Sequence, residues 1–171
     1  MPILIVAVLV ILGAAAAGGG AAVYGQAPQC ASEPGEARSA TEIGATLANA
    51  GRVVVDEREA TTLTRGYIGS VVADARVCFT PGAAHLSGKV PLGPVTPSFY
   101  ATLGVEFVGT QPRATDLDVK VGALPSVPGV SDVVKRTISD LINQSLAQWK
   151  IDQPYAAEFA SGSATIAQLP R

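Results

Sequence analysis

Residues 74–92 read DARVCFTPGAAHLSGKVPL and carry the clearest structural pattern in the chain. Small or apolar side chains at Ala75, Val77 and Phe79 alternate with polar ones, and a second alternating run follows the turn at Pro81-Gly82. Successive side chains of a strand point to opposite faces of a sheet. The pattern therefore predicts an antiparallel hairpin with one apolar face and one polar face.

Two more hairpins follow the same logic. Residues 99–107 and 115–121 alternate on either side of a turn at 109–112, and residues 122–129 (GALPSVPG) end this run of strands. Near the C-terminus, residues 155–160 and 163–169 flank the turn Ser161-Gly162. The sequence thus predicts about six strands.

Helical patterns lie before and after the strands. Ser39 to Glu42 matches a capping box for a helix that Gly51 ends, and Asp56 begins a second helix that Gly69 ends. Between 131 and 149 the apolar spacing predicts a helix of about five turns. We expect an α+β fold: one antiparallel sheet of about six strands packed on this long amphipathic helix, with two shorter helices before the sheet.

The N-terminus predicts where the domain is located. The first charged side chain is Glu33, and residues 2–24 would span about 33 Å as a helix, which matches one hydrocarbon core. We expect a transmembrane anchor at 1–25, a linker at 26–37 and an extracytoplasmic domain at 38–171. A secretory signal, cleaved within the Ala/Gly run or after Ala27, is the alternative and would give a secreted protein.

Charge and cysteine content narrow the partners. The formal net charge is −2 and the 12 Lys and Arg residues are scattered, so we expect no nucleic-acid partner. An exported protein with two cysteines can join them, which makes Cys30 and Cys78 a candidate disulfide; two unrelated thiols are the alternative.

The chain offers little for catalysis. His85 is the only histidine and is predicted on the polar strand face, as an ordinary surface residue, although a pair with Cys78 is conceivable. Asp116 and Asp118 share a strand face, Glu106 is a candidate to lie opposite them, and a solvated face is the ordinary meaning of that pattern. We therefore expect no metal, no cofactor and no enzyme; a hydrolase centred on His85 is the least favoured alternative.

Apolar residues on the strands and on the long helix suggest a binding crevice instead. A sheet that does not close completely on the helix leaves an apolar cleft between them; a fully packed core is the alternative. The residues expected to line the cleft are Phe79, Leu86, Phe99, Leu103, Val105, Phe107, Val134, Ile138 and Leu141.

The chain resembles small bacterial envelope proteins that have one N-terminal membrane segment and a tubular lipid-binding (TULIP-like) domain outside it. The stretches that carry the resemblance are VVVDEREATTLTRGYIG, VCFTPGAAHLSGKVPLG, LDVKVGALPSVPG and VVKRTISDLINQSLAQW, within residues 52–169. The resemblance implies binding of a lipid or another apolar ligand at the cell envelope. The alternative function is an envelope protein–protein interaction or scaffold module with a closed core.

Overall fold

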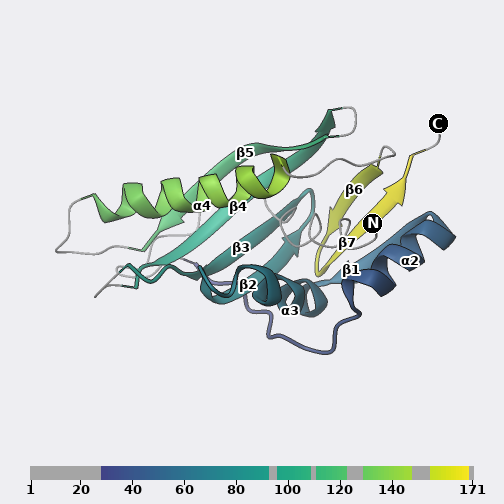
Figure 1. Cartoon of the computed structure of the whole chain (residues 1–171), viewed down its shortest axis with the longest axis horizontal. Coiled ribbons are helices and arrows are strands. Elements are labelled where there is room, and N and C mark those ends of the chain that lie inside the picture. Colours follow the sequence, from purple (N-terminus) through teal and green to yellow (C-terminus); the bar gives the residue numbers. More distant parts are fainter. Residues whose placement is uncertain (1–27, 93–95, 109–110, 123–128, 148–154, 170–171) are drawn as a thin grey trace.

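The computed structural model describes residues 28–92, 96–108, 111–122, 129–147 and 155–169 (Figure 1). The predicted anchor at 1–25 lies outside these ranges, as does the predicted C-terminal end of the long helix at 148–149. Within the described ranges, no helix combines the length and the apolar character that a bilayer crossing requires.

The described ranges form three helices and seven strands, so the predicted α+β class is confirmed. The helices are α2 (Ala40–Ala50), α3 (Glu57–Ile68) and α4 (Val130–Ala147). The strands are β1 (Arg52–Asp56), β2 (Ala73–Thr80), β3 (Ala83–Lys89), β4 (Ser98–Val108), β5 (Gln111–Val121), β6 (Tyr155–Ala160) and β7 (Ser163–Gln168).

The prediction of one sheet with about six strands is wrong. The structure has two antiparallel sheets, one with strand order β1-β7-β6 and one with order β2-β3-β4-β5. The C-terminal hairpin pairs with β1, whose Val55 lies opposite Ala164. It does not extend the larger sheet at β2, because α3 and the segment before α2 already occupy that edge.

Side-chain hydroxyl, guanidinium and carboxylate groups cover the edge of β2. Thr61 of α3 accepts from the Val77 N–H at 2.9 Å and donates to the Val77 carbonyl at 3.3 Å. Arg65 donates from Nε to the Ala75 carbonyl at 2.8 Å, and Glu57 accepts from the Phe79 N–H at 2.7 Å. These bonds satisfy the backbone groups that an open sheet edge would expose, so they block addition of another strand.

The apolar face of the larger sheet forms the core. Val77, Leu86, Ala101 and Val119 lie opposite one another in successive strands and are all buried. Helix α4 packs beside β5 and contributes its own buried stripe of Val134, Ile138 and Ile142 to the same cluster (Figure 1). The predicted alternation and the predicted helical stripe are therefore both confirmed.

The two sheets meet where their hairpins turn. The Gly82 N–H donates to the Phe159 carbonyl at 3.0 Å, and the Gly162 N–H donates to the Phe79 carbonyl at 3.3 Å. The rings of Phe79 and Phe159 stack with centroids 5.9 Å apart. Each hairpin turn thus fixes the position of the other, and one hydrophobic cluster continues through both sheets.

Candidate functional site

Residues 28–38, which we call the strap, cross the polar face of the larger sheet and continue along α3. Residues 28–37 of the predicted linker at 26–37 belong to this strap and contact the domain closely. A disulfide joins Cys30 to Cys78, and the Cys30 N–H donates to Ser87 Oγ at 3.0 Å. Ser32 Oγ donates to the Val77 carbonyl and also pairs with Thr61 Oγ1 at 3.1 Å.

The strap stays in contact with α3 as it approaches α2. The Gly35 N–H donates to Thr62 Oγ1 at 3.0 Å, and the same hydroxyl lies 3.0 Å from the Gly35 carbonyl. A Cβ at position 35 would lie 2.8 Å from Arg58 Nε, so only glycine fits here without a shift of the arginine. Close polar contacts therefore order a segment whose composition is typical of a loop.

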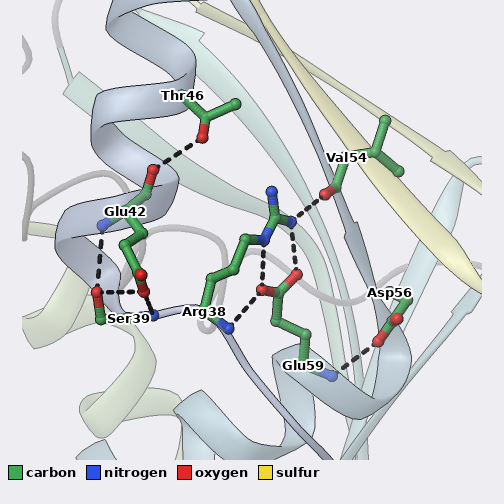
Figure 2. A network of polar contacts seen from close by, with 7 residues as sticks. All are labelled: Arg38, Ser39, Glu42, Thr46, Val54, Asp56 and Glu59. Atoms are coloured by element: carbon green, nitrogen blue, oxygen red, sulfur yellow. Dashed lines mark hydrogen bonds and ion pairs between the residues drawn. The ribbon is translucent and has the colours of Figure 1, made fainter.

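At the end of the strap the surface is hollowed into an open groove of about 650 Å³. It lies between the strap, the N-terminus of α2, strand β1 and the N-terminus of α3 (Figure 2). Carboxylates dominate its walls, with one cation among them. Its lining residues are Glu36, Ala37, Arg38, Glu42, Val54, Asp56 and Glu59.

Arg38 and Glu59 form an ion pair in this groove. Arg38 Nε lies 2.8 Å from Glu59 Oε1 and Nη2 lies 2.7 Å from Oε2, so the pair is bidentate (Figure 2). The Arg38 N–H also donates to Oε1, at 3.0 Å, and Nη2 reaches the Val54 carbonyl at 2.6 Å. Glu59 is only 5% exposed. Its hydrogen bonds to the guanidinium are the main reason that the pKa of Arg38 is raised.

Two other acids of the groove, Asp56 and Glu42, accept hydrogen bonds at the N-termini of helices. Asp56 Oδ1 accepts from the Glu59 N–H at 2.8 Å and caps α3. Glu42 accepts from the Ser39 N–H at 2.6 Å while Ser39 Oγ accepts from the Glu42 N–H, which confirms the predicted capping box. The bond from the Ser39 backbone is the largest cause of the lowered pKa of Glu42.

The groove has the chemistry of a binding surface for cations. Four carboxylates, at Glu36, Glu42, Asp56 and Glu59, line the groove together with one guanidinium, so the formal charge of the groove is negative. Val54 adds an apolar side chain that is 47% exposed. Among the described residues no group of His, Cys, Asp and Glu is arranged to hold a metal ion.

The prediction of His85 as an ordinary surface residue is wrong, because it is only 5% exposed. Its ring lies 3.0 Å from Thr80 Oγ1 through Nε2 and 3.2 Å from Thr102 Oγ1 through Nδ1. Tyr100 stacks on it with ring centroids 5.1 Å apart, and the strap crosses the neighbouring residues. Burial lowers the pKa of His85, which favours the neutral ring.

The structure separates the other candidate groups for chemistry. Cys78 lies directly opposite His85, but its sulfur is bonded to Cys30. Glu106 pairs with Arg113 in the strand register and Asp118 pairs with Thr102, so Glu106 does not lie opposite Asp118. Asp118 is exposed, as a solvated strand face predicts.

The predicted apolar crevice residues divide into three groups. Phe79, Leu86, Phe99, Val134 and Ile138 are buried and belong to one hydrophobic cluster. Leu141 is partly buried at its edge. Leu103, Val105 and Phe107 belong to β4, and their side chains lie outside the described part of the structure.

Sequence reasoning missed the pair at the centre of the groove. The sequence pattern identifies Asp56 only as the start of a helix, and it gives no role to Glu59 or Arg38. The spacing of three between Asp56 and Glu59 does place the Glu59 N–H on the cap. Only the path of the strap, which no local pattern records, brings Arg38 to Glu59.

No protein-family model matches this chain, and no curated protein shows significant similarity to it.

Proposed function

We propose that this chain is a membrane-anchored extracytoplasmic domain without catalytic activity, which docks an extended, positively charged segment of another envelope protein. The observation that carries the proposal is the acid-lined groove beside strand β1. The apolar leader and the Cys30–Cys78 disulfide support the location, because disulfides persist in oxidising compartments outside the cytosol.

Strand β1 suits recognition of an extended segment. It is the outermost strand of the order β1-β7-β6, so among the described residues one of its edges is not paired with a strand, and an added segment would take the place of the bond from Arg38 to the Val54 carbonyl. Added strands bind such edges through main-chain hydrogen bonds, and side-chain pockets supply specificity. Val54, exposed on this strand and lining the groove, would contact an apolar residue of the added segment.

Charge complementarity selects the partner. Arg38 neutralises Glu59, whereas Glu36, Glu42 and Asp56 keep negative charges that attract a cationic segment. The bonds that Glu42 and Asp56 accept at the helix starts come from neutral groups and do not cancel these charges. Charges at the rim of an interface act mainly on the association rate and the choice of partner, and salt screens them. We therefore expect selectivity for Lys- or Arg-containing segments that weakens as ionic strength rises.

A peptide titration tests the proposal. The full chain in detergent is titrated with a fluorescent peptide of alternating Lys and Val, and with a matched peptide in which Glu replaces Lys. We expect only the Lys peptide to bind, with affinity reduced about tenfold, or about 1.4 kcal/mol, in the Glu36→Gln/Asp56→Asn variant. Glu158→Gln, an exposed change on β6, serves as the control variant. Equal binding of both peptides, or of neither, contradicts the proposal.

A second candidate ligand is a lipid or another apolar molecule, as the TULIP-like resemblance implies. The observation in its favour is a seam of partly buried apolar residues between β5 and α4, formed by Leu117, Val121 and Leu141. Opening of this seam would admit an acyl chain. Native mass spectrometry and a fluorescent fatty-acid probe test it, with Leu141→Glu expected to abolish binding. Absence of both co-purified lipid and probe binding rejects this candidate.

A further inference from the structure

We infer that the strap holds the polar face of the larger sheet against the membrane surface, so that this face is an interface with lipid headgroups. The inference rests on the proposed function in one respect, the anchoring of the chain by its N-terminal leader. It goes beyond that function by naming which side of the domain meets the bilayer and which contacts fix it there.

The tether between the leader and the domain is short. On the sequence, the apolar leader ends at Tyr24, an aromatic residue of the type enriched at membrane interfaces. From there the chain reaches Cys30 in six steps, which span about 20 Å at most when fully extended. Cys30 therefore lies within about 20 Å of the bilayer if Tyr24 lies at its surface.

The point where the tether joins the domain is fixed. Cys30 is 2% exposed, bonded to Cys78 of β2 and hydrogen-bonded to Ser87 of β3. Further along the strap, Ser32 and Gly35 bond to β2 and α3. The chain that follows the leader is therefore fixed to the domain at β2 and β3, on one face of the larger sheet.

Register identifies the rest of that face. Ser87 lies opposite Tyr100, and Tyr100 lies opposite Lys120, so these three residues form a row across β3, β4 and β5 on the side of Cys30. Lys120 is exposed. With neighbouring strands about 4.8 Å apart, Lys120 lies about 10 Å across the face from Ser87. Helix α4 packs against β5 and buries its apolar stripe in the core on the opposite face, so its exposed residues lie on the other side of the sheet from Cys30.

The charges near Cys30 balance. Arg76 pairs with Glu33 of the strap at 2.8 Å, and Lys89 pairs with Asp74 at 2.7 Å. Asp118 and Lys120 add one exposed charge of each sign. Such a face is not drawn to anionic headgroups by net charge. The covalent tether accounts for its position, and the proximity should not depend on salt.

Depth-dependent fluorescence quenching tests the inference. The oxidised full chain is reconstituted in phosphatidylcholine vesicles that contain a lipid with a nitroxide on its headgroup. A fluorophore is attached at Lys120→Cys or, as the matched control, at Lys135→Cys on the exposed side of α4. The spacing between sheet and helix and the diameter of the helix are about 10 Å each. The label at position 135 should therefore lie much farther from the bilayer than the label at position 120. We expect quenching at position 120 to exceed that at 135 by at least about twofold.

Two further variants test whether the short tether and the disulfide cause the difference in quenching between the two positions. A Gly/Ser spacer of about 20 residues inserted after Gly25 adds about 25 Å of mean reach, leaves the strap intact, and should abolish the difference. Cys30→Ser/Cys78→Ser should reduce it, provided that circular dichroism shows a folded domain. Equal quenching at 120 and 135 in vesicle-bound protein overturns the inference alone. Failure of the full chain to float with vesicles overturns the membrane anchor and the inference together.

Discussion

At the scale of single residues, the groove depends on a buried acid that is balanced by a half-exposed base. Glu59 accepts three hydrogen bonds from Arg38, whose side chain is 40% exposed. Removing one partner of a buried pair leaves an uncompensated charge, whereas solvent weakens the effect when the other partner reaches water. The pair therefore contributes to stability as well as to the shape of the groove.

Glu59→Gln should destabilise the domain by about 1–3 kcal/mol, discounted for the exposure of Arg38. The amide retains the length of the side chain but replaces one carboxylate oxygen by an NH₂ group that faces the guanidinium. The urea midpoint of the oxidised protein measures the change. Glu158→Gln should stay within about 0.5 kcal/mol of the parent. Equal midpoints for the two variants would show that the pair adds no stability.

His85 predicts a pH dependence with a defined sign. Burial lowers the pKa of the folded state below the ordinary value of 6.5, so the unfolded chain binds the proton more readily. The contribution to stability is complete above about pH 6.5 and is lost as the pH falls through the folded pKa. The lowered pKa values of Glu42 and Asp74 act in a more acidic window.

Urea unfolding between about pH 7.5 and 5.5 measures this effect, which amounts to at most about 1.4 kcal/mol per pH unit for one proton. His85→Gln keeps a polar side chain near Thr80 and Thr102 and should lose this part of the slope. The carboxylates remain in both proteins and act as an internal control. If parent and variant lose stability in parallel, His85 does not titrate on unfolding.

At the scale of elements, α3 replaces a neighbouring strand at the edge of β2. Thr61→Val keeps the shape of the side chain but removes the hydroxyl that bonds the Val77 N–H. An unsatisfied buried donor costs about 1–3 kcal/mol, and hydrogen exchange at Val77 should accelerate. Thr46→Val removes a hydroxyl that bonds only the Glu42 carbonyl within the same helix, at a partly exposed position of α2, so it is the control and should change stability little. An unchanged exchange rate at Val77 would contradict the role of Thr61.

Elements with a strong local pattern were predictable, and their partners were not. The period of two around Ala75, Val77 and Phe79 gave the buried strand face, and Ser39 with Glu42 gave a helix start. Pairing of β1 with β7 joins residues more than a hundred positions apart, and no local pattern records it. The strap was equally hidden, because its Pro, Gly and Ser content is also that of a flexible linker. His85 was wrongly predicted to be a surface residue because the sequence does not show that the strap crosses the strand on which it lies.

At the scale of the whole molecule, the contact of the two hairpin turns joins the sheets. Phe159 of the smaller sheet stacks on Phe79 of the larger one, and its carbonyl accepts from Gly82. Complete burial makes Phe→Ala cost about 3–5 kcal/mol, so a half-buried Phe159 should cost about 2 kcal/mol. Stability need not fall evenly, since structural units can open separately when their contacts are weakened.

We therefore expect Phe159→Ala to lower the opening free energy of β1 and β7 amides more than that of β3 amides, as measured by native-state hydrogen exchange. Phe159→Leu keeps an apolar contact at the corner and should show a smaller difference. The reason is topological: β1, β6 and β7 bond to one another, whereas the larger sheet retains α3, α4 and the disulfide without them. If all amides of Phe159→Ala lose protection equally, the shared core and not this corner couples the two sheets.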